Sequence, residues 1–365
     1  MRILLTNTSL INRAGSELYL FEVATRLLVR GHSPVAFTPR LGPVAEALRA
    51  ATIPVVDRLD AIGEPPDLIH GQHHVETLTA LLHFPGVPAV FVCHGWAPWE
   101  ELAPRFPRIL RYVAVDHTTR ERLVSEQGIP PERVDVVLNF VDLERFQPRA
   151  PLPPAPRRAL VFSNHAHEGT YLPAVREACS RFSIEVDVAG IASGRPVTEP
   201  EKLLPAYDLV FAKGRAALEA MAVGAAVMLC DASGAGPLIT SEDLDRLRPL
   251  NFGIRTLRLA HRHFALRRRH FDLHRPRRIG GADRTALGDP LPQRLILRPL
   301  AWDAHAAAVR HSAAGLQQEE ALVGGGGRNA AAATFHRQCP VIGRRIETKH
   351  RELEAVLPFG FAVTA

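Results

Sequence analysis

The sequence predicts an α/β protein with two domains, and three observations carry this prediction. Short apolar runs alternate with amphipathic helical runs from Arg2 to about Leu247, a pattern typical of parallel sheets covered by helices. The segment QPRAPLPPAP, with five prolines in ten residues, breaks this pattern and predicts a stiff linker over 147–157. A chain of 365 residues is long enough to form a core on each side of that linker. We therefore expect one domain over 1–146 and a second, short one over 158–257.

The stretch YDLVFAKGRAALEAMAVGAAVMLCD, residues 207–231, shows the α/β pattern most clearly. It predicts a strand over 209–212, a helix over about 216–222 and a second buried strand over 225–230. Gly214 indicates a tight turn between the first strand and the helix. The stretch is therefore expected to form a strand-helix-strand unit of a parallel sheet.

This turn is a candidate anion site. Ligands of parallel α/β sheets bind beyond the carboxyl ends of the strands, where Lys213, Gly214 and Arg215 stand at a helix N-terminus. Glu219 follows one helical turn later, where its carboxylate can accept hydrogen bonds from sugar hydroxyls. The alternative is an ordinary unit whose charges face water, and the local pattern does not choose between the two.

The N-terminal region predicts a second loop of this kind. A strand over 2–6 precedes an amphipathic helix over about 17–30, with Ser16 as its N-cap. Gly15 lets a phosphate or a sugar approach the backbone, although a lone glycine in such a loop is more often a simple turn. Further strands are expected over 35–37, 53–56, 67–70, 87–93, 112–115, 133–138, 159–162 and 184–189, and further helices over 43–50, 118–127 and 241–247.

Histidines follow two of these strands. His70, His73 and His74 come at the end of one, and His94 with Trp96 comes at the end of the next. Three close histidines also suggest a metal, but the carboxylate partners and remote ligands of a metal site are not evident. We expect a substrate-facing loop and no metal. His94 is placed to bond a ligand hydroxyl, and the alternative is a histidine that caps backbone carbonyls.

The composition, 46% hydrophobic and 22% charged, is that of a soluble globular protein. Four scattered cysteines, with no CxxC pair, are expected to be reduced thiols of a cytoplasmic protein; they are Cys93, Cys179, Cys230 and Cys339. The N-terminus, MRILLTNTSL, is too short and too polar for a signal peptide, and no apolar run of eighteen residues occurs. We expect neither secretion nor membrane spanning.

The net charge of +6 does not indicate a nucleic-acid partner. Residues 258–365 hold 18 of the 44 Lys and Arg and 9 of the 38 Asp and Glu, which leaves 26 basic and 29 acidic residues in 1–257. The first part of the chain therefore has a net charge of −3, and the basic character belongs to the tail alone.

The chain resembles the family 4-like glycosyltransferases of the GT-B fold in seven segments that occur in the family's order, namely MRILLTN, AGSELYLFEVATRLLVRGHSP, DLIHGQHH, VFVCHG, FPRILRYVAVD, GIPPERVDVVLNFVDLERFQP and LEAMAVGAAVM. The resemblance covers about residues 1–240 and implies two Rossmann-like domains that face a cleft. It also implies transfer of a sugar, with retention of configuration, from a nucleotide-diphosphate sugar and without a required metal or cofactor. The implied acceptor is a glycan, a lipid-linked molecule or a small metabolite, and peripheral membrane association is compatible with it.

The resemblance implies roles for individual residues. Gly15, with Ser16 beside it, matches the glycine loop near the donor's diphosphate. His94 matches the histidine that contacts the donor sugar, and Glu219 matches the second glutamate of a paired-glutamate motif, which binds the nucleotide ribose. We expect His94 and Glu219 to be catalytic, with His70, His73, His74 and Trp96 on the acceptor side.

The chain departs from the family at two points. Phe211 stands eight residues before Glu219, where the family has its first glutamate, and SNHAHE replaces the Arg and Lys expected after the strand over 159–162. We hypothesise that Lys213 and Arg215 supply these two positive charges instead. The departures leave two alternatives open: a degenerate GT-B protein that binds a nucleotide sugar without turnover, and a GT-B nucleotide-sugar epimerase.

The tail over 258–365 has no sustained helical or alternating period. One interpretation is a basic, partly disordered arm that binds nucleic acid or acidic lipid. The other is a shift of the coding frame near residue 257, because out-of-frame GC-rich sequence yields this mixture of Arg, Ala, Pro, His and Gly. We favour the frameshift, since no aromatic interleaving or binding motif accompanies the charge.

Overall fold

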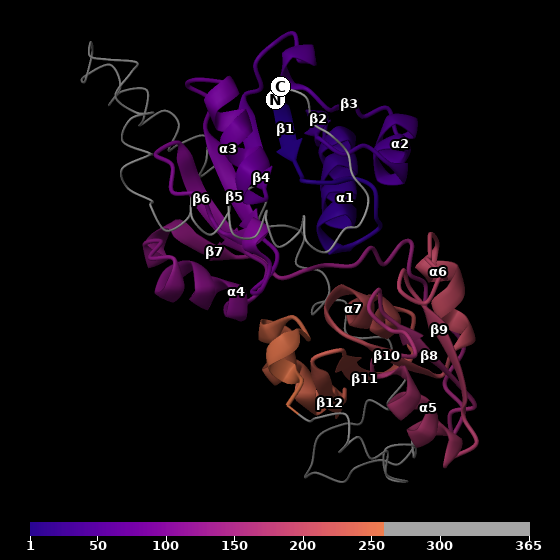
Figure 1. Cartoon of the computed structure of the whole chain (residues 1–365). Coiled ribbons are helices and arrows are strands. Elements are labelled where there is room, and N and C mark those ends of the chain that lie inside the picture. Colours follow the sequence, from indigo (N-terminus) through magenta and orange to yellow (C-terminus); the bar gives the residue numbers. More distant parts are fainter. Residues whose placement is uncertain (259–365) are drawn as a thin grey trace, which may run out of the picture. The chain divides into compact units, whose positions relative to one another are not determined.

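The structure is a computed structural model that describes residues 1–258 (Figure 1). These residues all belong to one compact unit of the chain, residues 1–313. They form two sheets, one of seven strands and one of five, with helices between the strands in sequence. The expected α/β class with two Rossmann-like sheets is therefore confirmed. The predictions for Cys339 and for the tail lie outside the described residues.

The first sheet has the strand order β3-β2-β1-β4-β5-β6-β7, and every pair in it is parallel. Its strands are β1 (Arg2–Thr6), β2 (Ser33–Phe37), β3 (Val55–Val56), β4 (Leu68–Gln72), β5 (Ala89–Cys93), β6 (Ile109–Ala114) and β7 (Val134–Val136). Its helices are α1 (Gly15–Val29), α2 (Pro43–Ala50), α3 (His74–His83) and α4 (His117–Glu121).

Strands β4 and β5 are buried along their whole length. Central strands of a parallel sheet are covered on both faces, which is why such strands read as continuous apolar runs. β5, with the sequence AVFVC, follows this rule, whereas β4 carries the polar residues His70 and Gln72 among its buried positions. Buried polar side chains need hydrogen-bond partners, so these two residues are candidates for a special role.

The second sheet has the strand order β12-β11-β10-β8-β9, parallel except for β12, which is antiparallel to β11. Its strands are β8 (Arg158–Phe162), β9 (Glu185–Ala189), β10 (Leu209–Ala212), β11 (Ala226–Asp231) and β12 (Gly234–Leu238). Its helices are α5 (Leu172–Ser180), α6 (Pro200–Leu203), α7 (Gly214–Ala222) and α8 (Leu244–Leu247).

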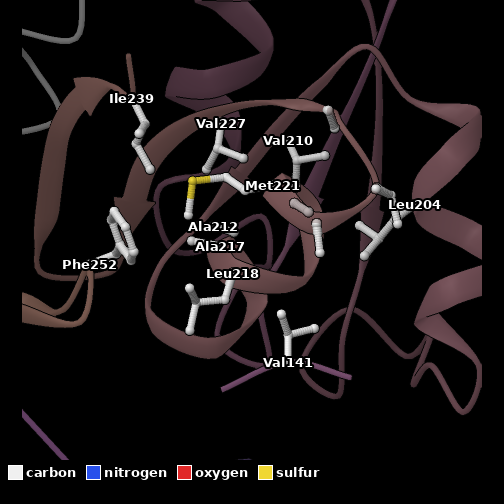
Figure 2. Packing of buried hydrophobic residues seen from close by; sticks show 14 of the residues in the cluster. Val141, Leu204, Val210, Ala212, Ala217, Leu218, Met221, Val227, Ile239 and Phe252 are labelled. Atoms are coloured by element: carbon white, nitrogen blue, oxygen red, sulfur yellow. The ribbon is translucent and has the colours of Figure 1, made fainter. Parts of the chain in front are cut away.

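Strand β10 separates the two cores of the second sheet. Val210 and Ala212 belong to the cluster on the α7 side, where Leu218, Met221 and Val227 also pack (Figure 2). The alternate residues Leu209 and Phe211 belong to the cluster on the α5 side. This alternation follows from the two-residue period of a strand, and it places the side chain of Phe211 inside a core.

The segment after β7 belongs partly to the second sheet's core. Val141 and Phe146 pack in the same cluster as α7, and Figure 2 shows Val141 near Leu218. The proline-rich segment 147–157 has neither helix nor strand. It is held by Asp208, whose carboxylate accepts a hydrogen bond from Arg149 Nη2 at 2.9 Å and another from the backbone N–H of Arg157 at 2.9 Å. The linker is therefore tied to the start of β10.

Three local expectations are wrong. α1 begins at Gly15, so Ser16 is inside the helix; Ala14 takes the N-cap position without a side-chain hydrogen bond, and Ser16 Oγ donates to Glu17 instead. The helix expected over 118–127 is α-helical only to Glu121, after which its turns widen to a π-helix. β12 was not expected, because its sequence GAGPL is rich in residues that weaken strands. A proline is tolerated there because β12 lies at the sheet edge.

Within the described part of the chain, no helix is both long and apolar enough to cross a membrane.

Replacing Phe211 by glutamate, the residue of the family motif, is expected to destabilise the core of the second sheet. Phe211 is fully buried among apolar residues such as Val161 and Met228, so a carboxylate there would be desolvated without a partner. We expect a loss of about 3–5 kcal/mol in the free energy of unfolding, measured by urea denaturation followed by circular dichroism. The control Phe211→Leu keeps an apolar side chain and is expected to cost on the order of 1 kcal/mol. Equal stability of Phe211→Glu and the parent would contradict the placement.

Candidate functional site

Polar residues gather at the carboxyl ends of three neighbouring strands of the first sheet. Asn7 follows β1, Gln72 ends β4 and His94 follows β5, and these strands are adjacent and parallel. Parallel strands end at the same edge of a sheet, which is where ligands of α/β proteins bind. Asn7 and Gln72 are completely buried, and His94 is half-buried. The chain therefore places a polar cluster where the sequence predicted a substrate-facing loop.

His94 is held from two sides. Its backbone N–H donates to Glu101 Oε2 at 2.7 Å, and its ring Nε2 lies 2.8 Å from Gln72 Oε1. The ring of Tyr19, from α1, packs edge-on against it with centroids 4.6 Å apart. Burial, together with nearby His73, holds the pKa of His94 well below its ordinary value. The imidazole is consequently neutral at pH 7.

His73 occupies the junction between β4 and α3 in a left-handed conformation, with φ of 63°. Its Nδ1 accepts a hydrogen bond from the backbone N–H of Thr8 at 3.1 Å. Burial lowers the pKa of His73 to about 4, so the ring is neutral and its proton sits on Nε2. That Nε2 faces Glu101 Oε1 at 3.7 Å. Thus His73 and His94 meet at one carboxylate.

The other two histidines of the predicted cluster are placed differently. His70 is inside β4, fully buried, and its ring stacks on Tyr19 with centroids 6.0 Å apart. His74 is the first residue of α3, and its Nδ1–H donates to the backbone carbonyl of Leu102 at 2.8 Å. Its pKa is lowered, because burial outweighs this hydrogen bond. His70 thus contributes to the core and His74 fastens a loop.

Trp96 is half-buried beside Arg255. The guanidinium carbon of Arg255 lies 4.8 Å from the centroid of the indole ring, and the same side chain forms an ion pair with Glu121. Stacking of a guanidinium on an indole is a favourable cation–π contact. The face of Trp96 that Arg255 covers is therefore occupied within the protein.

In the second sheet, the N-terminus of α7 carries the predicted anion-binding residues. Lys213 is the N-cap, and its Nζ forms an ion pair with Asp231 at the end of β11. Gly214 opens the helix with φ of 55°, a left-handed conformation that favours glycine. The Lys213 side chain is 36% exposed and that of Asp231 only 3%. Burial alone would raise the pKa of Asp231, but the bond to Lys213 keeps it below its ordinary value.

Arg215 is buried and already neutralised. Its Nε donates to Glu219 Oε1 at 3.0 Å, and its Nη2 pairs with Glu22 of α1. Burial raises the pKa of Glu219, and the charge of Arg215 opposes that rise. A buried ion pair loses much of its stability when one partner is removed or diverted. Arg215 therefore fixes Glu219 in place, and its charge is less available to a ligand than that of Lys213.

Gly15 is the first residue of α1, and the residues before it form the loop between β1 and α1. A Cβ built on Gly15 would meet no atom within 4 Å, so neither crowding nor its φ angle requires glycine there. Arg13, two residues earlier, is half-buried. Burial lowers the pKa of Arg13, as does the charge of Arg145, while Glu201 and Glu219 act in the opposite sense. The loop thus carries a half-buried cation close to charged groups of both sheets.

Sequence reasoning missed Gln72, Glu101, Glu22 and Arg13. Gln72 carried a signal, because a polar residue at the end of a buried strand stands out. Glu101 and Glu22 carried none, because each meets its partner only through the tertiary fold. Within residues 1–258, no three His, Cys, Asp or Glu side chains are arranged to hold a metal ion. Cys93, Cys179 and Cys230 are buried and unpaired with one another.

Ionisation of Glu101 is expected to make the protein less stable as the pH rises. Burial raises its pKa from 4.5 to about 7, although Arg122 and the His94 N–H act against the rise. The folded state therefore favours the protonated acid: this contribution to stability is complete below pH 4.5 and is lost as the pH rises through 7. The loss corresponds to roughly 3 kcal/mol.

Urea denaturation of the parent and of Glu101→Gln across this pH range checks the expectation. The amide cannot ionise, and its oxygen can still accept from His94, so the parent should lose stability relative to the variant between pH 4.5 and 7. Glu100, Cys93, Arg122 and His73 also surround the carboxyl group and are the same in both proteins. Parallel stability curves would show that Glu101 does not titrate in this range.

Comparison with known proteins gives likenesses of fold at low identity. A search of curated protein sequences found no match. A glycosyltransferase from Rickettsia africae ESF-5 is 15% identical, over 62% of this chain and 78% of that one, with a TM-score of 0.46. Anabaena Alr3699/HepE in complex with UDP-glucose is 18% identical, over 69% and 88%, with a TM-score of 0.45. A Listeria monocytogenes protein proposed to be a UDP-N-acetylglucosamine 2-epimerase is 15% identical, over 62% and 78%, with a TM-score of 0.40.

The family comparison concerns the first sheet. The model described as Glycosyltransferase Family 4 matches residues 13–145, from the loop before α1 to the segment after β7. This range includes His73, His94 and Glu101 with the hydrogen bonds described above. The resemblance expected from the sequence is thereby confirmed over residues 13–145, the part of the chain that this family model matches.

Proposed function

We propose that the protein transfers a sugar from a nucleotide-diphosphate sugar to a hydroxyl-bearing acceptor, with retention of configuration and without a metal ion. One observation carries the proposal: the Glycosyltransferase Family 4 match contains a polar cluster, His94 with Gln72 and Glu101, at the carboxyl edge of its parallel sheet. The acceptor is a glycan, a lipid-linked molecule or a small metabolite. The Anabaena and Rickettsia likenesses agree with a glycosyltransferase but are too distant to add to the argument.

The N-terminus of α7 is the proposed diphosphate site. Its first backbone N–H groups and the helix dipole favour an anion, and Lys213 stands beside them with part of its side chain exposed. A phosphate that approaches this helix competes with Asp231 for the ammonium group. Arg13, from the loop before Gly15, is the second proposed cation. We propose Arg13 in place of Arg215 as the second cation that binds the diphosphate, because the charge of Arg215 is needed between Glu22 and Glu219.

Glu219 is proposed to bind the ribose of the nucleotide. Arg215 Nε donates a hydrogen bond to its Oε1 at 3.0 Å, which leaves Oε2 as the oxygen that this bond does not use. A carboxylate with one oxygen anchored and one remaining is suited to accept a hydrogen bond from a sugar hydroxyl. His94 is proposed to accept from a hydroxyl of the donor sugar.

Charge stabilisation is the proposed source of catalysis. When the bond to the anomeric carbon breaks, one further negative charge develops on the departing diphosphate, and Lys213 and Arg13 would stabilise it without a metal. Neutral His94 would orient the sugar. The acceptor oxygen would form its bond to the anomeric carbon on the face that the diphosphate leaves, while the proton of the acceptor hydroxyl passes to the departing phosphate oxygen. Gly15 would allow the backbone of the β1–α1 loop to approach the phosphates.

A second function, binding without turnover, is favoured by a specific observation. Phe211 lies in a core where the family has a glutamate, and the residues 163–168 that follow β8 include no Arg or Lys. Both a sugar contact and a charge pair would be missing from their family positions. An epimerase is the other alternative.

One experiment separates the three. The full chain is incubated with UDP-, GDP- and ADP-sugars and a panel of glycan, lipid-linked and polyol acceptors, and products are followed by NMR. Release of nucleoside diphosphate together with a new glycosidic linkage supports the transferase, and so does slow hydrolysis of the nucleotide sugar. The anomeric configuration of the product tests retention. Saturable binding in calorimetry without any product indicates a binder. A changed sugar that is still attached to its nucleotide indicates an epimerase.

Replacing Lys213 by methionine is expected to weaken binding of the cognate nucleoside diphosphate, with UDP, GDP and ADP as the probes. Loss of a charged hydrogen bond to phosphate costs about 1.5–3 kcal/mol, or roughly a 10- to 100-fold rise in Kd. Isothermal titration calorimetry measures this rise. The thermal midpoint of each variant is recorded alongside, because Lys213→Met also leaves Asp231 without its partner.

Two controls accompany this variant. Lys202→Met removes an exposed lysine, paired with Glu199, that lies outside the proposed site, and it should leave Kd unchanged. Asp231→Asn keeps Lys213 and removes its competitor, so it should bind the diphosphate as tightly as the parent or more tightly. An unchanged Kd in a folded Lys213→Met protein would remove Lys213 from the site.

A further inference from the structure

Among residues 1–258, Gln72 is the one buried side chain that contacts the ring of His94 through a hydrogen bond. It ends β4, is completely buried, and its Oε1 lies 2.8 Å from His94 Nε2. Its backbone is fixed as well, because its N–H donates to Thr6 Oγ1 at 3.0 Å and its carbonyl accepts from the same hydroxyl at 2.9 Å. The backbone of Gln72 is therefore held in place beside His94.

A neutral imidazole carries one proton, so the atom that faces Nε2 decides which nitrogen is the acceptor. A carbonyl oxygen at that position requires Nε2–H and leaves the lone pair on Nδ1. The neutral state is itself maintained by burial and by the neighbours His73, His70 and Arg215, all of which disfavour a positive charge on His94. A pKa well below its ordinary value keeps the ring neutral at pH 7.

Other contacts hold the ring in place without choosing its tautomer. Tyr19 packs edge-on against it, and Glu101 binds the backbone N–H of His94 rather than the ring. Within residues 1–258, Gln72 is the residue whose hydrogen bond reaches a ring nitrogen of His94. The amide nitrogen of Gln72 is buried and has no hydrogen-bond partner within these residues. The bond to His94 is therefore the one side-chain hydrogen bond that orients the amide there.

We propose that Gln72 is a positioning residue for His94: its Oε1 accepts the Nε2 proton and thereby fixes the tautomer whose Nδ1 accepts a hydrogen bond from a hydroxyl of the sugar substrate. The role of the sugar rests on the proposed function. The tautomer does not, and it is measured without any substrate.

The test is ¹⁵N NMR of histidine-labelled full-length protein, in which long-range ¹⁵N–¹H correlations distinguish the Nε2–H from the Nδ1–H form. The His94 signals are assigned by their loss in His94→Gln. We expect the Nε2–H form in the parent. In Gln72→Met, which has a similar shape but no acceptor, the proton should redistribute between the two nitrogens.

Two further variants make the measurement specific. Gln72→Glu keeps an acceptor oxygen, so it should retain the Nε2–H form and move the titration of His94 to higher pH. Gln127→Met removes a different, half-buried glutamine, whose Oε1 accepts from the Ala103 N–H, and it should leave the His94 signals unchanged. An Nδ1–H form in the parent would mean that the amide presents nitrogen to the ring, and it would overturn the proposal. An unchanged tautomer in folded Gln72→Met would do the same.

Kinetics connect the tautomer to the substrate. For any nucleotide sugar that the parent turns over, kcat/KM of Gln72→Met should fall about 10- to 100-fold, as when a residue that orients a functional histidine is removed. The Kd of the nucleoside diphosphate, which lacks the sugar, should not change. Gln72→Glu should recover part of the loss. If the parent turns over no sugar, the proposed function fails while the tautomer measurement still decides the role of Gln72.

Discussion

Parallel pairing of β1, β4 and β5 is the constraint on which the first candidate site depends. Strands β4 and β5 are buried along their length, so their side chains can reach a ligand only where the strands end. Parallel strands end at one edge, and there the chain places Gln72 and His94 within hydrogen-bond distance. The cost of burying these polar groups is offset by bonds among them, which also hold them in one geometry. Fold and site therefore share the same hydrogen bonds.

A second constraint, the need to neutralise buried charge, determines what the second sheet can contribute. Arg215 stands where the sequence suggested a phosphate ligand, yet its guanidinium lies between the carboxylates of Glu22 and Glu219. Taking that charge away would leave two buried anions without a partner, a change that is strongly unfavourable. Lys213 is paired with a single carboxylate and is partly exposed, so exchange of its partner for a phosphate costs less. In the sequence, Lys213 and Arg215 look like equivalent phosphate ligands, because both lie at the N-terminus of α7. In the structure they differ, because Arg215 is more deeply buried and is paired with two carboxylates.

Sequence periodicity was sufficient to predict most of the strands, because apolar runs bounded by glycine or polar residues are characteristic of central parallel strands. It failed at β12, an edge strand whose Gly236 and Pro237 are residues that weaken strands. It also failed at Ser16, which has the chemistry of an N-cap but is the second residue of the helix. His94 was identified from its place after a strand. Gln72 is 22 residues away in sequence, and its bond to His94 depends on how β4 and β5 align, which no local pattern contains.

The sequence by itself determined the α/β class, the two sheets, the resemblance to family 4 glycosyltransferases and the strand ends at which polar residues gather. These properties follow from short-range patterns of apolar side chains and from the order of motifs. Only the tertiary structure decided which histidine belongs to the core, which cation is already neutralised, and why Phe211 stands in a core. Burial and charge pairing arise between segments far apart in the chain, such as α1 with α7, so they are properties of the fold rather than of any single stretch.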